Sequence, residues 1–159
     1  DFLDIFLISN CNFLIGDSSG MSMAPMIFRK KSLYTNISEL HSMSFIDSFY
    51  KPIIVLKKFK SLKTGEYIPY SLVLEKRLSE LDNIYELNNI GYDIEDSTED
   101  EILNATKEMD HLVNKDGYLN FDKKLEKKFN DILLKHNKYP LKESKISNFF
   151  LKKNSFLLE

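Results

Sequence analysis

One short run in the chain has residue types and spacing that could do chemistry, the segment Gly16-Asp17-Ser18-Ser19-Gly20. Apolar residues 13–15 precede it, and an apolar segment containing Pro25 follows it. A serine in such a loop can act as a nucleophile when a histidine base and an orienting carboxylate reach it. A loop of small residues between a strand and a helix can instead hold an anion on its backbone N–H groups. A third interpretation is that the segment is only a turn of the chain.

In the first interpretation, Ser18 is the nucleophile of a serine esterase. The segment matches the Gly-x-Ser-x-Gly elbow of α/β-hydrolases as a string, but neither the trypsin-like Gly-Asp-Ser-Gly-Gly nor the lipase-like Gly-Asp-Ser-Leu pattern is complete. The chain has three histidines, His41, His111 and His136, and none follows an aspartate by three residues. Because His111 and His136 fall on predicted amphipathic helices, the esterase remains an alternative without an identified base.

The other reactive side chains have simpler interpretations. Cys11 lies at the edge of a predicted strand and is expected to be a small packed side chain. Residues 108–111 form a solvated helix face, since no second histidine falls one turn from His111 to complete a metal site. His41 lies in a predicted loop, where it is a candidate for a ligand contact. We predict no metal site and no cofactor.

The composition is that of a globular domain. The chain has 159 residues, of which 43% are hydrophobic and 29% charged, and its net charge is −2. That length favours one domain, and the charge excludes a global basic field for nucleic acid. The apolar stretch 2–15 is interrupted by polar residues and is too short to span a membrane. The first residue is Asp1 rather than Met, which predicts a fragment of a longer chain.

The first part of the chain predicts a strand–helix–strand unit, from which parallel α/β sheets are built. A short, mostly buried helix is expected over residues 2–10 and a buried strand over 13–15. A helix over 20–28, capped by Ser18 or Ser19, leads to a strand over 32–36. Residues 37–52 show no period and predict a long surface loop.

The rest of the chain predicts a mixture of strands and helices. The expected elements are a strand at 53–58, a turn at 63–66, a helix at 71–81, a last strand at 92–95, a helix at 99–113, a loop at 114–120 and a helix at 121–133. Thr98 and Glu101 fit a capping box at the start of the helix at 99–113. The apolar tail at 146–159 is expected to pack onto the domain. These elements predict an α/β fold, specifically a Rossmann-like three-layer domain with C-terminal helices.

A resemblance extends over most of the chain. Residues 8–20, followed by the segment Ala24-Pro25-Met26-Ile27-Phe28, resemble the donor-site segment of a bacterial GT-B-type glycosyltransferase family of surface polysaccharide synthesis. Residues 57–65, 98–102 and 148–158 are similar to later stretches of that family. The chain departs from the pattern at 29–31, where the family has Gly-Lys-Pro, and at 55–57, where it has Ile-Pro-Lys.

The resemblance implies that this chain is the C-terminal, donor-binding part of a glycosyltransferase. Its implied reaction transfers a sugar from a nucleotide-sugar donor to a surface glycan or a lipid-linked acceptor. The donor diphosphate would be held by Gly16, Ser18, Ser19, Gly20 and the N–H of Met21, and a lobe before Asp1 would bind the acceptor. No Asp-x-Asp occurs in the sequence, which argues against the metal-dependent GT-A chemistry. A non-catalytic remnant of the donor-binding domain is the other alternative.

The expected location follows from the implied reaction. We predict a cytoplasmic enzyme, with the inner face of the cell membrane as a further option because the acceptor can be linked to lipid. No nucleic-acid partner is predicted.

Overall fold

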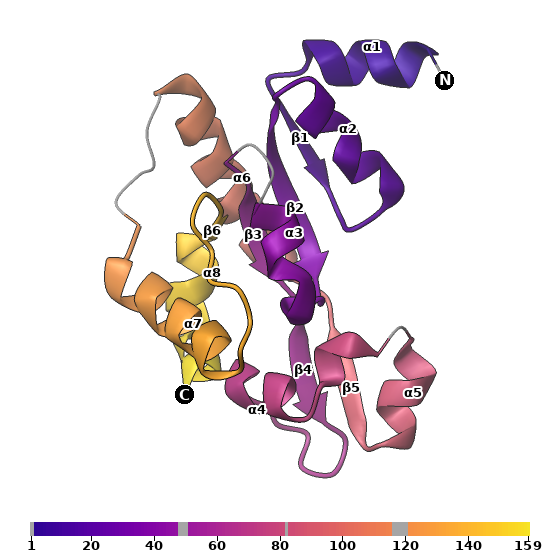
Figure 1. Ribbon diagram of the computed structural model, residues 1–159, viewed down its shortest axis with the longest axis vertical. Helices are drawn as coiled ribbons and strands as arrows, with labels where there is room; N and C mark the ends of the chain where they lie inside the picture. The colour runs from indigo at the N-terminus through magenta and orange to yellow at the C-terminus, as the bar shows by residue number, and fades with distance from the viewer. Residues whose placement is uncertain (1, 48–50, 82, 116–120) are drawn as a thin grey trace.

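The computed structural model describes residues 2–47, 51–81, 83–115 and 121–159. In this part of the chain, four parallel strands form a sheet in the order β1-β2-β3-β6 (Figure 1). The strands are β1 (Phe13–Gly16), β2 (Lys31–Ile37), β3 (Ile53–Leu56) and β6 (Lys145–Ile146). The protein is therefore mixed α/β with a mostly parallel sheet, consistent with the Rossmann-like α/β fold that the sequence predicts.

The two central strands are buried on both faces. Every residue of β3 is buried, and so are most residues of β2. Helix α6 (Glu99–Asn114) contacts β1, β2 and β3 on one face of the sheet. In Figure 1, α6 lies behind the sheet and α3 (Met43–Asp47) lies in front of it. Helices on both faces are what a parallel sheet requires, because its strands expose apolar side chains in both directions.

The connection between β1 and β2 is less regular than predicted. Instead of one helix over 20–28, a 3₁₀ turn (Gly20–Met23) leads into the short helix α2 (Ala24–Ile27). Ser19 occupies the N-cap position, but no side-chain capping hydrogen bond forms there. Arg29 then adopts a left-handed conformation (φ 51°), and the chain turns into β2.

The segment between β2 and β3 corrects the prediction of a long surface loop at 37–52. It contains a 3₁₀ turn (Leu40–Ser42) followed directly by α3. Leu40, Met43 and Ile46 are buried in the core. Three apolar residues at helical spacing were present in the sequence, but polar residues between them hid the pattern. Residues 48–50 lie outside the described part of the chain.

The first elements are less buried than predicted. Helix α1 (Phe2–Asn10) has only Ile8 buried among its described residues. Strand β1 contributes no buried residue, and the side chain of Ile15 is exposed. The reason is position: β1 is an edge strand of the sheet, and α1 packs beside α2 rather than on the central strands.

A second, antiparallel sheet of two strands extends the fold. It pairs β4 (Lys58–Ser61) with β5 (Tyr92–Glu95), and three short helices lie around it: α4 (Tyr70–Glu75), the 3₁₀ turn Leu78–Glu80 and α5 (Ile84–Asn89). The helix predicted at 71–81 ends early because Arg77 adopts a left-handed conformation (φ 58°). Helix α5 was not predicted from the sequence.

The C-terminal elements complete the core. Helix α7 (Lys123–Lys135) is capped by Asp122, and α8 (Asn148–Lys153) and the 3₁₀ turn Ser155–Leu158 follow β6. Phe150, Leu151 and Leu157 are buried, which confirms that the apolar tail packs onto the domain. Strand β6, which was not predicted, consists of two residues and is too short to give a sequence pattern. The predicted loop at 114–120 lies largely outside the described residues.

Candidate functional site

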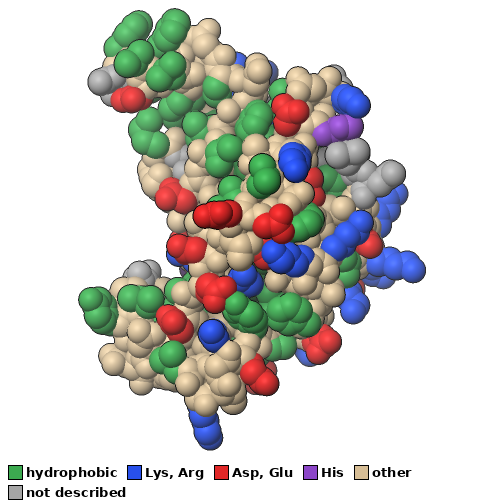
Figure 2. Space-filling view, turned by 180° about the vertical axis from the view of Figure 1, so that it is seen from behind, with side chains coloured by type: hydrophobic (Ala, Val, Ile, Leu, Met, Phe, Trp, Pro, Cys, Tyr) green, Lys and Arg blue, Asp and Glu red, His purple; other side chains and the backbone are tan. Residues whose placement is uncertain are grey.

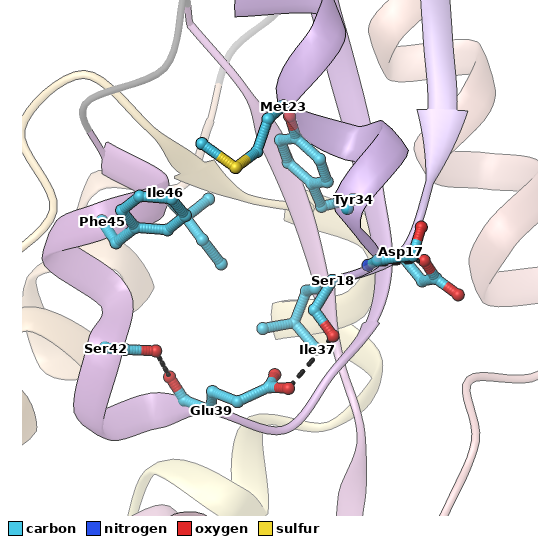
Figure 3. Close-up of a pocket in the computed structure, with 11 residues that line it drawn as sticks. Asp17, Ser18, Met23, Tyr34, Ile37, Glu39, Ser42, Phe45 and Ile46 are labelled. Carbon is cyan, nitrogen blue, oxygen red and sulfur yellow. Dashed lines mark hydrogen bonds between the residues drawn. The ribbon is translucent and has the colours of Figure 1, made fainter. Parts of the chain in front are cut away.

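The carboxyl ends of the parallel strands place the predicted loop at one edge of the sheet. Residues 17–20 follow β1, and Ser38 and Glu39 follow β2. Open α/β sheets bind ligands at this edge, in the crevice outside the carboxyl ends of the strands. A cavity of about 240 Å³ lies there (Figure 3). It is lined by Asp17, Ser18, Ser19, Gly20, Met23, Tyr34, Ile37, Glu39, Ser42, Phe45 and Ile46. We call it the β1–β2 cavity.

Glu39 connects the loop after β1 to the loop after β2 by hydrogen bonds. The Ser18 hydroxyl donates a hydrogen bond to Glu39 Oε1 at 3.0 Å, and the Ser38 backbone N–H donates to Oε2 at 3.1 Å. The Ser42 hydroxyl donates to the Glu39 backbone oxygen at 3.2 Å. Figure 3 shows the Glu39 carboxylate directed toward Ser18, while the Glu39 backbone oxygen faces Ser42. The serine is therefore paired with a carboxylate.

Asp17 shapes the loop from within. Its Oδ1 accepts a hydrogen bond from the Ser19 backbone N–H at 2.8 Å. Hydrogen bonds from the Ser19 side chain and backbone lower the pKa of Asp17. In Figure 3 the Asp17 side chain points away from the cavity. One backbone N–H of the predicted anion site is thus already bound to a carboxylate of the same loop.

The walls of the cavity are apolar. Phe45 and Ile46 extend from α3, and Met23 and Tyr34 lie opposite them (Figure 3). Burial raises the pKa of Tyr34 above its ordinary value near 10. An aromatic ring beside hydroxyl and carboxylate groups suits a ligand that has both an apolar face and hydroxyl groups.

The charge of the cavity favours hydroxyl donors over anions. Among the described residues that line it, Glu39 supplies a carboxylate that faces inward, and no lysine or arginine is present. A carboxylate accepts hydrogen bonds strongly from hydroxyl groups and repels a phosphate at short range. The 3₁₀ turn and α2 are each four residues long, so the loop has no long helix dipole behind it to offset that repulsion.

The predicted diphosphate residues divide into two groups. Ser18, Ser19 and Gly20 line the β1–β2 cavity, whereas Gly16 and Met21 do not. Gly16 ends β1, and its carbonyl accepts a hydrogen bond from the Thr35 hydroxyl at 3.2 Å. Met21 is exposed. The role of all five in binding a diphosphate stays a prediction.

The three histidines lie outside this cavity. His41 Nδ1 is 2.6 Å from the Ser79 carbonyl oxygen, and the ring lines a separate hollow beside Tyr139 and Pro140. His111 is in the last turn of α6, and His136 follows α7. The structure therefore does not bring a histidine base to Ser18 among the residues that line the cavity.

Glu39, Ser42 and Phe45 are site residues that the sequence analysis missed. They fall in the segment interpreted as a surface loop, where their spacing shows no motif. One signal could have found Glu39: it is an acidic residue placed directly after the second strand of a strand–helix–strand unit, at the edge where ligands bind.

Three further features concern Cys11, metal binding and membrane spans. The thiol of Cys11 is half-buried and donates to the Ile8 carbonyl at 3.1 Å. Within the described residues, no group of three His, Cys, Asp or Glu side chains could hold a metal ion. None of the described helices has the length and apolar content needed to cross a membrane.

A search of protein-family models, curated proteins and solved structures found no match to this chain. The glycosyltransferase resemblance therefore remains a prediction from the sequence.

Proposed function

We propose that this chain is the donor-binding part of a glycosyltransferase that transfers a sugar from a nucleotide-sugar donor to a surface glycan or a lipid-linked acceptor. The observation that carries the proposal is the β1–β2 cavity at the carboxyl ends of two parallel strands. The Ser18–Glu39 hydrogen bond joins the two loops that line it. The resemblance of residues 8–28 to a donor-site segment points to the same edge of the sheet.

Within this proposal, Glu39 binds hydroxyl groups of the donor. In dinucleotide-binding folds, an acidic residue at the end of the second strand accepts hydrogen bonds from a ribose, and this fold-level analogy supports the same role for Glu39. A ligand hydroxyl would replace the Ser18 hydroxyl on Oε1, and Ser18 would then be free to donate to another ligand oxygen. Phe45 and Ile46 would contact the apolar face of the same ring.

The cavity is small for a complete nucleotide-sugar. Its volume of about 240 Å³ lies below the roughly 300–1,000 Å³ of pockets that enclose a drug-sized ligand. It fits one ring of the donor, either the ribose or the sugar, and the remainder would lie outside it. The acceptor and the catalytic base would come from another lobe.

Calorimetry with the 159-residue chain tests this proposal. UDP, GDP, ADP and CMP and their sugar conjugates are titrated in the presence of EDTA, and one of them should bind. Glu39→Gln should weaken that binding by roughly 10- to 100-fold, because hydrogen bonds to a charged group contribute about 1.5–3 kcal/mol. Glu75→Gln, an exposed glutamate on α4, is the matched control and should bind as wild type.

The outcomes separate the alternatives. No heat from any ligand, with a folded chain, would overturn the proposal and favour the non-catalytic remnant. Covalent labelling of Ser18 by a fluorophosphonate would favour the serine esterase instead. Binding that Glu39→Gln leaves unchanged would place the ligand elsewhere on the molecule.

A further inference from the structure

A second cavity lies along the same edge of the parallel sheet, one strand beyond the first. Its volume is about 200 Å³, and Ser38, after β2, and Lys57, after β3, form its border with the sheet. Phe59 on β4 and Ile94 on β5 line it from the antiparallel sheet. We call it the β3 cavity. Because Ser38 and Glu39 are neighbours in the chain, the turn after β2 separates the two cavities.

Lys57 gives the β3 cavity a cation that the β1–β2 cavity lacks. Its Nζ lies 2.8 Å from Asp96 Oδ1, and the side chains are 26% and 68% exposed. An ion pair with so exposed a partner contributes little stability. The ammonium group can therefore exchange Asp96 for the anionic group of a ligand at small cost, while Asp96 remains solvated.

Ser79 contributes a second polar group to the lining of the same cavity. The residue lines the cavity and is only 4% exposed. Its Oγ is buried and has no hydrogen-bond partner among the residues that the structure describes. Buried hydroxyl groups in folded proteins are nearly always paired, so Ser79 keeps a hydrogen bond that a ligand oxygen in this cavity could complete.

The other side of the cavity is apolar. Phe59, Leu81, Leu87 and Ile94 line it, and Phe59 and Leu87 belong to the buried core. A dry cavity of about 150 Å³ is large enough to bind benzene, so about 200 Å³ accommodates a short aliphatic chain or one ring. The combination of one cation, hydroxyl groups and an apolar wall selects a ligand that is charged at one end and apolar at the other.

We propose that the β3 cavity is a second binding site, which takes a small amphipathic anion: a carboxylate or phosphate monoester whose charged group contacts Lys57 and Ser79 and whose apolar body packs on Phe59 and Ile94. Nothing in this proposal depends on the function proposed for the β1–β2 cavity. It assigns a role to Lys57 and Ser79, which the first cavity does not use.

Four probes test the chemistry of this site on the 159-residue chain. Butyl phosphate and pentanoate carry both an anionic and an apolar part. Inorganic phosphate lacks the apolar part, and butyltrimethylammonium carries the opposite charge. Binding is followed by shifts of backbone amide resonances, and the first two probes should move residues 57, 79 and 94. The stronger of the two tells whether the site prefers a phosphate or a carboxylate.

Two variants identify the contacts. Lys57→Met keeps the aliphatic stem and removes the charge, so affinity for the stronger probe should fall at least 10-fold. Ser79→Ala should lower it by a factor of about 3 to 10. Lys60→Met, on β4 but outside the cavity, is the matched control and should leave the affinity unchanged. Thermal unfolding verifies that each variant is folded.

Three results would overturn the proposal. Equal shifts with butyltrimethylammonium would show that the cation does not select the ligand. Equal binding of inorganic phosphate would show that the apolar wall contributes nothing. Should Lys57→Met fail to fold, the Lys57 side-chain resonances of the wild-type protein decide the question: an absence of any shift on adding either amphipathic anion would exclude Lys57 as its contact.

Discussion

At the scale of single residues, the loop after β1 combines a permissive backbone with a fixed hydrogen-bond pattern. Asp17 holds the Ser19 N–H, and Glu39 holds the Ser18 hydroxyl. Gly20 has open space around it: a Cβ added there would meet no atom within 4 Å. The glycine is therefore not required for packing, and it lines the β1–β2 cavity.

Gly20→Ala tests whether that open space is used by a ligand. We expect the free energy of unfolding to stay within about 0.5 kcal/mol of wild type, because the new methyl group causes no clash. Binding of the donor in the β1–β2 cavity should weaken, because the methyl group occupies space at its lining. Thermal unfolding and calorimetry measure the two effects.

Gly65→Ala is the contrasting control. Gly65 has a left-handed φ of 74° in the turn between β4 and α4, where a Cβ is strained. That variant should lose about 1 kcal/mol of stability with ligand affinity unchanged. Unaltered binding in Gly20→Ala would remove Gly20 from the site.

Tyr67 is a residue whose ionisation reports on the antiparallel sheet. Its hydroxyl donates to Glu95 Oε1 at 2.6 Å, and that hydrogen bond, together with burial, raises the pKa of Tyr67 to about 12. Because the folded pKa lies above the unfolded value near 10, this group's contribution to stability is complete below pH 10 and is lost as pH rises toward 12. The difference between the ultraviolet titrations of wild type and Tyr67→Phe isolates this one phenol and should show it ionising near pH 12. A difference curve with its midpoint near pH 10, the ordinary value for tyrosine, would contradict the assignment.

At the scale of elements, the start of α6 was predicted from sequence and its surroundings were not. Thr98 and Glu101 form the capping box that the Thr-Glu-Asp-Glu string indicates. The string could not show that Glu101 is fully buried, lies 3.4 Å from Lys58 Nζ and accepts from Asn154 at 2.8 Å. Burial acts to raise the pKa of Glu101, but hydrogen bonds from Asn154 and Thr98 and the charge of Lys58 together lower it. Contacts 43 and 53 residues apart in the chain have no local signature.

Lys58→Met tests the energetic weight of this buried pair. Removing the cation leaves Glu101 buried with its hydrogen bonds and without its opposite charge, so we expect a loss of about 3–5 kcal/mol in the free energy of unfolding. The double variant Lys58→Met/Glu101→Gln should recover part of that loss, because no uncompensated charge remains. Urea unfolding of the single and double variants measures both, and Lys60→Met serves as the control. A loss in the single variant no larger than in the control would show that the pair is not needed.

Helix α3 is held in place by a long-range contact that has no local signature in the sequence. Asp47 at its end is buried and accepts hydrogen bonds from the backbone N–H groups of Lys142, Glu143 and Ser144 at 2.8–3.0 Å. This contact joins α3, which supplies Phe45 and Ile46 to the β1–β2 cavity, to the segment before β6. The prediction of a loop at 37–52 failed because the stability of this short helix comes from tertiary contacts.

Asp47→Ala should therefore damage both stability and the cavity. Three N–H groups lose their acceptor, and we expect a loss of about 2–5 kcal/mol in the free energy of unfolding. Asp131→Ala, an exposed aspartate on α7, should stay within about 0.5 kcal/mol of wild type. Chemical denaturation measures the difference, and amide resonances of residues 43–46 report whether α3 moves. Stability equal to that of Asp131→Ala would contradict the anchoring role.

At the scale of the whole molecule, the apolar surface is unevenly distributed. Phe2, Leu3, Phe6 and Leu7 of α1 are all exposed, and Met21, Met23, Met26 and Ile27 continue the exposed apolar surface around α2. Figure 2 shows hydrophobic side chains gathered over α1. The sequence predicted a buried helix here because apolar residues recur at helical spacing. Spacing shows that a helix has apolar residues, whereas burial depends on which elements lie beside it.

This surface leads to a prediction about the chain in solution. An apolar dye that fluoresces in contact with exposed hydrophobic groups should bind the native 159-residue protein, because the exposed side chains around α1 and α2 offer it an apolar surface. Most monomeric proteins give little such signal, since contiguous apolar patches beyond a few hundred Å² are rare on them. Phe2→Ser/Phe6→Ser removes two exposed rings whose centroids lie 6.4 Å apart, and should lower the dye signal and the tendency to self-associate. Tyr85→Ser on α5, where the ring is 77% exposed but isolated from α1, is the matched control and should change neither. Because α1 contributes only Ile8 to the buried core, both variants should unfold at the wild-type temperature. A dye signal equal in the double variant and in wild type would show that the exposed rings of α1 do not form the surface that the dye binds.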